Sequence, residues 1–273
     1  KTYYFLHFFY LFSSNFLGFI CIATAPVVLS DNHASDGVQW STGAPLEMYG
    51  CSFKEGIDGY EQSQKFAASW NKWADDNDAF DSHVAQLMWT EFSDGQYPTD
   101  FFWLGYWDSY DSAGKDMDIR SANGDEMYAE ANKFIEDCAH SDWGAWVLVQ
   151  AGDFTNGNHL TEFSDCVYKE GKSDDDLLLA NTEYAALLAE RGFNGESMGM
   201  AQLWPRAGSP VGIGNSPSFK WVVGHANFAA YSSFTNELWN EGLMIDFYRL
   251  YGDIVQCDSN RVYHSQVVRT PSS

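Results

Sequence analysis

In some short stretches of the chain, hydrophobic and polar residues alternate, which is the pattern of a strand. In others, hydrophobic residues recur every three or four positions, which is the pattern of a helix. "PLEMYGCSF" at 45–53 alternates residue by residue, which predicts a strand with one buried face. Over 59–77 the spacing changes, because Phe66, Trp70 and Trp73 recur at intervals of four and three. That interval places the three rings on one side of a helix, facing a core.

The same patterns predict the order β-α-β-β-α-β twice along the chain. The first series has strands at 45–53, 83–92, 100–107 and 143–150, with helices at 59–77 and 121–138. The second has strands at 161–169, 197–205, 219–226 and 261–269, with helices at 174–192 and 233–252. This order is that of the ferredoxin-like unit, in which two helices cover one face of an antiparallel sheet.

Sequence similarity between the two series indicates a tandem duplication. "CSFKEG" at 51–56 recurs as "CVYKEG" at 166–171, an offset of 115 residues. Further matches, at offsets of 116, 119 and 119, pair Ala85-Gln86-Leu87 with Ala201-Gln202-Leu203, Gly105 with Gly224, and Cys138 with Cys257. The offsets increase along the chain, which two small insertions in the second series would explain. We therefore expect one unit at 44–150 and a second at 160–270.

The cysteines outside the N-terminal segment are even in number and allow three pairings. In a ferredoxin-like unit the last strand pairs with the first in antiparallel fashion. Cys51 lies late in a first strand and Cys138 just before a last one, so their side chains should meet. We predict the disulfides Cys51–Cys138 and Cys166–Cys257, one within each unit.

Two such units can bury their open sheet faces against each other. The expected fold is therefore α+β, with two tandem ferredoxin-like βαββαβ units packed as a single-chain pseudo-dimer that resembles the dimeric α+β barrel superfamily. The chain also resembles a group of secreted, uncharacterised proteins of marine bacteria, through the Cys51–Gly56 motif, "WNKWA" at 70–74 and "WLG" at 103–105. That resemblance implies no particular activity.

The first 30 residues form an apolar, aromatic segment that opens with Lys1 and is typical of a signal peptide or an uncleaved N-terminal anchor. The segment and the paired cysteines together predict a secreted or periplasmic protein. The formal net charge is −23, from 38 acidic and 15 basic side chains. Such a field repels nucleic acid and anionic lipid, so neither is an expected partner once the signal is removed.

Candidate catalytic chemistry lies where the two units differ. In the Gly105/Gly224 alignment, His225 stands where the first unit has Tyr106, and Asn227 stands where it has Asp108. His225 is the candidate acid or base, with Asp108 as a carboxylate beside aromatic rings. The alternatives are a hydrogen-bonded histidine at a strand end and a helix-capping aspartate.

The candidate ligand-binding residues come from the second and third strands and from the residues just after each strand. A cavity between the two sheets would be lined by Gln86, Trp89, Trp103, Tyr106, Gln202, Arg206 and Asn227. Gln86 and Gln202 would contribute a pair of amide groups if both point inward. The histidines show no metal-ligand spacing, so we predict neither a metal nor another cofactor.

Three hypotheses of function remain open from the sequence. The first is a secreted protein that binds a small hydrophobic or aromatic molecule in the cavity between the sheets. The second is a cofactor-free, monooxygenase-like enzyme that uses His225 and Asp108. The third is a structural or interaction protein whose interior is filled by its own side chains. In each case we expect a monomer or a weak oligomer.

Overall fold

The computed structural model describes residues 43–93, 99–152, 158–209 and 217–271, so the predicted signal segment at 1–30 lies outside the described residues. The N-terminal half (43–152) contains β1 (Ala44–Phe53), α1 (Gly59–Asp76), β2 (Val84–Phe92), β3 (Phe101–Tyr106), α2 (Tyr110–Asn123), α3 (Asp125–Ala131) and β4 (Ile135–Val149). The C-terminal half (158–271) contains β5 (Asn158–Tyr168), α4 (Asp174–Glu190), β6 (Met198–Ala207), β7 (Phe219–His225), α5 (Phe228–Asn240), α6 (Leu243–Tyr251), β8 (Val255–Cys257) and β9 (Arg261–Arg269).

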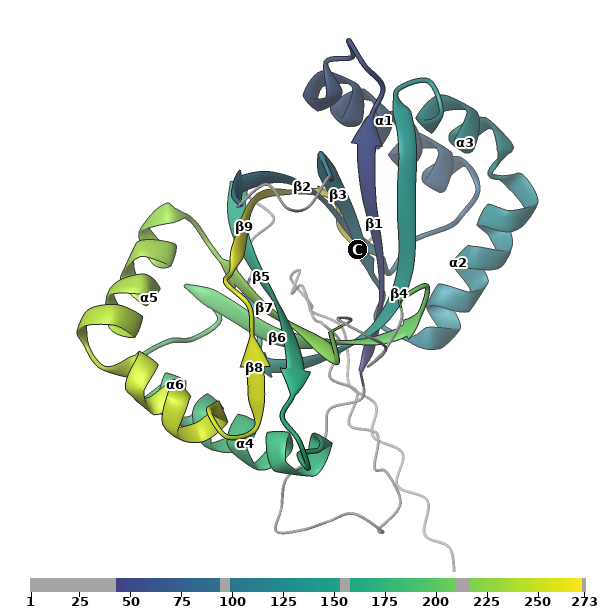
Figure 1. The fold of residues 1–273 in the computed structure, drawn as a ribbon. Helices are drawn as coiled ribbons and strands as arrows, with labels where there is room; N and C mark the ends of the chain where they lie inside the picture. Colours follow the sequence, from purple (N-terminus) through teal and green to yellow (C-terminus); the bar gives the residue numbers. More distant parts are fainter. Residues whose placement is uncertain (1–42, 94–98, 153–157, 210–216, 272–273) are drawn as a thin grey trace, which may run out of the picture.

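The strands close into a barrel rather than forming two stacked sheets (Figure 1). The ring runs β7-β6-β4-β1-β3-β2-β9-β5 and returns to β7, while β8 pairs only with the end of β5. The last strand of each half joins the halves: β4 pairs with both β1 and β6, and β9 pairs with both β5 and β2. The protein is therefore α+β with a closed barrel of eight strands.

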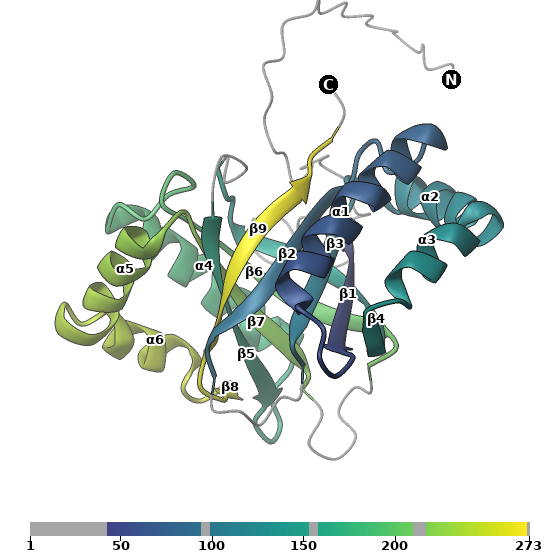
Figure 2. The same ribbon diagram turned by 90° about the horizontal axis from the view of Figure 1, so that it is seen from above.

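Helices cover the outside of the barrel in two separate layers, one over each half (Figure 2). Three groups of buried hydrophobic residues result from this arrangement. One lies under α1, α2 and α3 and is built on Trp70 and Trp103, and a second lies under α4, α5 and α6 and is built on Tyr184 and Trp221. The third fills the barrel interior with Leu46, Met48, Met88, Leu104, Trp143, Phe163, Leu203 and Tyr263.

The second helical region of each half differs from the prediction. The sequence pattern predicts single helices at 121–138 and 233–252, but α2 begins at Tyr110 and α5 at Phe228, and each is followed by a second short helix. The hydrophobic pattern does not predict the start of α2, because the buried residues of this helix are Ala113 and Asp116, a small residue and a polar one. The segment from Ile135 to Cys138 belongs to β4 and not to a helix.

The ladders also correct the alignment between the halves by one residue. Cys51 pairs with Phe101 and Cys166 with Phe219, which sets the offset of the third strands at 118 rather than 119. His225 therefore matches Trp107, and Asn227 matches Ser109. These last two are the N-cap residues of α5 and α2, which supports the corrected alignment.

A one-residue shift moves a side chain to the other face of a sheet. Leu87 lies opposite Trp103 and Gln202 lies opposite Trp221, so Gln202 corresponds to Leu87 and not to Gln86. Gln86 points into the barrel, where its Oε1 lies 2.9 Å from Nε2 of His159. Gln202 points out, towards α4.

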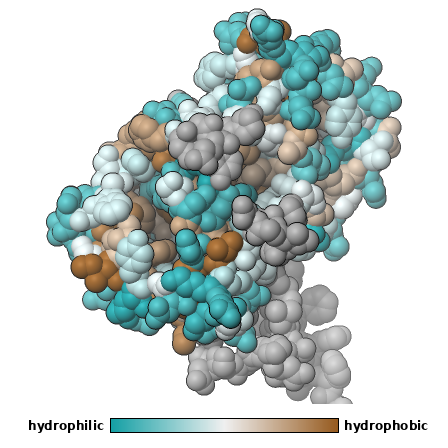
Figure 3. Space-filling model, viewed as in Figure 1, coloured by the Kyte–Doolittle hydropathy of each residue, from teal (hydrophilic) through white to brown (hydrophobic). Residues whose placement is uncertain are grey.

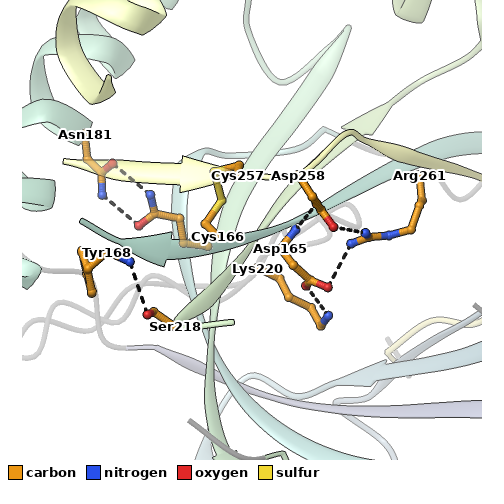
Figure 4. Close-up of a disulfide and its surroundings, with 10 residues drawn as sticks. Asp165, Cys166, Tyr168, Asn181, Ser218, Lys220, Cys257, Asp258 and Arg261 are labelled. Carbon is orange, nitrogen blue, oxygen red and sulfur yellow. Dashed lines mark hydrogen bonds and ion pairs between the residues drawn. A yellow bond between two sulfur atoms is a disulfide. The ribbon is translucent and has the colours of Figure 1, made fainter. Parts of the chain in front are cut away.

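Both predicted disulfides are present, and each joins directly opposed residues of neighbouring strands. Cys51 is bonded to Cys138 between β1 and β4, and Cys166 is bonded to Cys257 between β5 and β8. Figure 4 shows the second disulfide beside Asn181, whose side-chain amide exchanges hydrogen bonds of 2.9 and 3.0 Å with that of Gln202. Disulfides of this kind fit an oxidising, non-cytoplasmic compartment. Among the described residues, no helix is long and apolar enough to cross a membrane.

Candidate functional site

The barrel interior has little room for a ligand. Its central hydrophobic residues separate a cavity of about 120 Å³, which is lined partly by Gln86, Tyr106 and His159, from one of about 170 Å³ at the other end. Ligand pockets in proteins usually measure about 300–1,000 Å³. As far as the described residues line them, these two cavities of the predicted space between the sheets are therefore smaller than a usual ligand pocket.

Larger cavities lie outside the barrel, between the strands and the helices. The C-terminal cavity measures about 430 Å³ and lies against the inner side of α5 and α6. Its aromatic lining consists of Tyr184, Trp221, Phe234, Phe247, Tyr248 and Tyr251. Its polar lining includes Ser164, Lys169, Asp258 and Asn260. Figure 3 shows the outer surface of this half, where apolar residues lie among hydrophilic ones. The cavity volume falls within the range of small-molecule sites.

A buried acid–base pair, His225 and Glu162, lies next to the C-terminal cavity but does not line it. Nε2 of His225, at the end of β7, lies 2.5 Å from Oε1 of Glu162 on β5. Both residues are buried, and Nδ1 of His225 has no hydrogen-bond partner in the structure. The other oxygen of Glu162 accepts a hydrogen bond of 2.5 Å from Nδ2 of Asn260. Since Asn260 lines the cavity, the pair is connected to it through one side chain.

This arrangement fixes the orientation of the imidazole. A carboxylate that accepts from Nε2 favours the tautomer with its proton on Nε2, so the lone pair of Nδ1 is left for another proton. His225 also contacts the rings of Tyr231 and Phe234 in α5, with centroids 5.4 and 5.5 Å away. The sequence analysis identified His225 but not Glu162, whose contact with His225 depends on the pairing of β5 with β7.

The N-terminal cavity occupies the corresponding place in the other half and measures about 340 Å³. Glu47 lies in its lining, 115 residues before Glu162 and at the same ladder position. Here the partner is Nη1 of Arg120, 2.9 Å from Oε2 of Glu47, with Nε2 of His140 at 3.2 Å from the same oxygen. Burial alone would raise the pKa of Glu47, but the His140 hydrogen bond and the Arg120 charge outweigh it and hold that pKa below its ordinary value.

The other predicted site residues are dispersed. Asp108 lies in the N-terminal half, apart from His225, and α2 is capped by Ser109 instead. Partial burial opposes ionisation of Asp108, yet hydrogen bonds with Ser112, Ser82 and Ser109 outweigh it and lower the pKa of this carboxyl group.

The predicted aromatic and polar ligand residues also separate. Trp103 lines the N-terminal cavity, whereas Tyr106 lines the small barrel cavity. Trp89 packs outside the barrel with its ring centroid 4.8 Å from that of Tyr60. Arg206 is exposed, with its guanidinium 4.3 Å from the ring centroid of Tyr110. Asn227 caps α5 by accepting a hydrogen bond of 2.9 Å from the backbone N–H of Ala230.

His83 is a buried polar residue that the sequence did not single out. Neither ring nitrogen has a hydrogen-bond partner in the structure, and the ring packs against Trp70, Phe80 and Trp107. A Cβ at Gly105 would lie 2.2 Å from its Nε2, so the glycine is what makes room for the imidazole. Burial lowers the pKa of His83 to about 3, although the nearby charge of Glu47 acts the other way.

We predict a pH-dependent stability that originates at His83. Its pKa in the folded protein is below the unfolded value of about 6.5, so its contribution is complete above that pH and is lost as the pH falls from 6.5 towards 3. Over that window this one group should lower the free energy of unfolding by about 1.4 kcal/mol per pH unit. In urea unfolding between pH 7 and 4, the free energy of unfolding should depend less steeply on pH for His83→Leu than for the unchanged protein. Equal slopes in the two proteins would contradict this assignment.

Comparisons with known proteins identify the fold. The "putative monooxygenase" of Lactobacillus acidophilus aligns over 85% of this chain and 97% of its own, with a TM-score of 0.53 and 10% identity. The "putative monooxygenase" of Fusobacterium nucleatum aligns over 83% and 93%, with a TM-score of 0.53 and 13% identity. Chlorite dismutase from Candidatus Nitrospira defluvii is a weaker match, at 0.45 and 4%. No family model matches the sequence, and no curated protein does.

At these identities the likeness shows the fold alone, an α+β barrel with helices outside. Haem iron in proteins is most often held by a histidine. Among the described residues that line the two helix-side cavities, none is a histidine, so we assign no step to haem.

Proposed function

We propose that the protein is a monooxygenase-like enzyme that binds a small, neutral aromatic molecule in the C-terminal cavity. The observation that carries this proposal is the His225–Glu162 pair, linked through Asn260 to a 430 Å³ aromatic cavity. The lining has one cation, Lys169, and one anion, Asp258, so it does not select for charge. Aromatic walls of this kind favour planar apolar ligands.

The pair supplies a proton acceptor once Asn260 moves aside. Oε2 of Glu162 accepts from Asn260, which lines the cavity, so a substrate that displaces this amide can give the proton of an acidic C–H group to Oε2, with His225 holding the other carboxylate oxygen. The resulting carbanion is electron-rich enough to reduce O₂. The overall change at a methylene carbon is R₂CH₂ + O₂ → R₂C=O + H₂O, in which the substrate supplies all the electrons. The names of the two structurally similar proteins support this class of reaction, and proton transfer by a positioned base typically contributes about 10²–10⁴ to a rate.

Anthrone, a planar ketone with an acidic methylene group, is a suitable probe. We expect it to raise the melting temperature of the full chain and to be oxidised with incorporation of label from ¹⁸O₂, as followed by mass spectrometry. His225→Gln should retain the binding and lower the rate about a hundredfold. His264→Gln, outside the cavity lining, should leave both unchanged.

The outcomes separate the hypotheses. Binding without oxidation would contradict the enzyme and support the small-molecule-binding protein. If neither binding nor oxidation is seen across a panel of neutral aromatic compounds, the remaining hypothesis is a structural or interaction protein. An unchanged rate in His225→Gln would show that the pair is structural.

Two further expectations join this proposal. We infer that 44–150 and 160–270 are tandem ferredoxin-like units that form a single-chain pseudo-dimer, and the repeated order of elements and the matched ladders support it. We also infer export behind residues 1–30 and kinship with the secreted proteins of marine bacteria, which the two disulfides support. N-terminal sequencing of the mature protein tests the export.

A further inference from the structure

We propose that the N-terminal cavity is a second ligand site, selective for a small organic cation. This site is separate from the one proposed above and does not depend on it. The cavity measures about 340 Å³, which is large enough for a small molecule. Its aromatic lining consists of Tyr49, Phe66, Trp70, Phe101, Trp103 and Tyr128.

The charges in the lining distinguish this cavity from its counterpart. Glu47 and Glu136 share the lining with a single cation, Arg120, so the lining carries an excess of negative charge. Glu47 is buried and is neutralised by Arg120, which leaves the exposed Glu136 as the carboxylate at the surface of the cavity. The next residue, Asp137, lies opposite Ser52 and so has its side chain on the other face of the sheet. A cation gains from this field, and an anion is repelled.

The aromatic rings suit the same ligand. A cation within about 6 Å of a ring centroid is attracted by the negative face of the ring, and several rings together form the cage that binds quaternary ammonium groups. The structure already shows the attraction, because the guanidinium carbon of Arg120 lies 6.0 Å from the ring centroid of Tyr49. Trp70 and Trp103 form an edge-to-face pair, with centroids 4.8 Å apart.

A matched pair of tyrosines lies in the two cavities. Tyr128 of α3 lines the N-terminal cavity and is 44% exposed, and Tyr248 of α6 lines the C-terminal cavity and is 65% exposed. Each accepts, through its backbone carbonyl, a hydrogen bond of 2.9 Å from the N–H four residues later, that of Asn132 or Gly252. The side-chain ammonium of Lys54 donates to the backbone carbonyl of Asn132, and that of Lys169 donates to the backbone carbonyl of Gly252. Because both tyrosines are partly exposed, either can be replaced with little disturbance of the core.

Choline and its neutral isostere 3,3-dimethyl-1-butanol test the proposal on the full chain. We expect choline to change the tryptophan fluorescence and to bind in calorimetry, with an affinity that falls as salt is raised from about 10 to about 300 mM, while the isostere binds markedly more weakly. Tyr128→Leu should weaken choline binding about two- to fivefold, and Tyr248→Leu should not affect it. Glu136→Gln should weaken it by a similar factor of about two to five, and Glu190→Gln, in the other half, should have no effect.

The melting temperature of each variant shows whether it is folded. Equal affinity for choline and the isostere would overturn the selectivity for cations. Equal effects of Tyr128→Leu and Tyr248→Leu would overturn the location, and so would an unchanged affinity in the folded Tyr128→Leu protein. No choline binding at any salt concentration would overturn the site itself. None of these results bears on anthrone, whose binding depends on the other cavity.

Discussion

Replacing Cys166 and Cys257 by serine is expected to lower the free energy of unfolding by about 4–5 kcal/mol. The disulfide closes a loop with a sequence separation of 91 residues, and the chain-entropy model assigns an energy of this size to such a loop. It also holds β8, a strand of three residues whose ladder with β5 consists of three residue pairs. Without the bond, the segment after α6 keeps chiefly this short ladder and the hydrogen bonds that flank it, between Lys169 and Ile254 and between Asp165 and Asp258.

Urea unfolding of the purified oxidised proteins measures the loss. The matched control is Cys51→Ser with Cys138→Ser, which opens a loop with a separation of 87 residues and should have a similar cost. The rates of amide hydrogen exchange near the lost bond should differ between the two variants, because β4 is 15 residues long and β8 is only three. The amide of Val167 should therefore exchange faster in the first variant, while that of Ser52 stays protected in the second. A loss below about 1 kcal/mol in the first variant would contradict this account.

Arg120→Met is expected to cost about 3–5 kcal/mol, because it leaves the buried carboxylate of Glu47 without its cation. The side chain of Glu47 is 4% exposed and that of Arg120 12%, so water replaces little of the lost interaction. His140, whose side chain is 41% exposed, remains as a weaker partner. Since the pKa of Glu47 is lowered in the folded protein, the stability that it contributes is present above its unfolded pKa and is lost on acidification.

A double-mutant cycle distinguishes loss of the ion pair from loss of packing. Glu47→Met with Arg120→Met should be more stable than Arg120→Met alone, because no unpaired charge is left in the interior. The exposed pair of Arg249 with Glu183 gives the control, and Arg249→Met should leave the free energy of unfolding nearly unchanged. Equal losses in the single and double variants would show that the pair contributes only through its aliphatic parts.

The sequence predicts most of the elements and both disulfides, since these depend on local pattern and element order. β1, β2, β3 and α1 lie within one or two residues of the expected ranges. The start of α2 could not be predicted in the same way, because its amphipathic pattern is weak: a carboxylate, Asp116, is one of its two buried residues. That carboxylate is satisfied by the backbone N–H of Phe80 and by Nε1 of Trp107, contacts that no local pattern reveals.

The site was harder to predict because the face on which a strand side chain lies depends on register. The alignment by similar triplets places Gln202 with Gln86, and the hydrogen-bond ladder separates them by one residue. The equivalence of Glu47 and Glu162 does not have this difficulty, because both lie in the first strands and their spacing of 115 equals that of Cys51 and Cys166. Acidic residues inside a strand pattern, at the repeat spacing, were the available signal for both.

The closure of the barrel also has a consequence for how the chain reaches its native state. Arg269, at the end of β9, donates from its side chain to the backbone carbonyl of Phe80, 189 positions earlier, and the ladder of β9 with β2 joins segments nearly as far apart in the sequence. Contacts of such high contact order form slowly, because a long loop must close before they are made. Until β9 emerges, a chain under synthesis carries β2 as an open edge that can pair with another molecule. The period of greatest risk of aggregation is therefore the interval between completion of the first half and arrival of the last nine residues of the barrel.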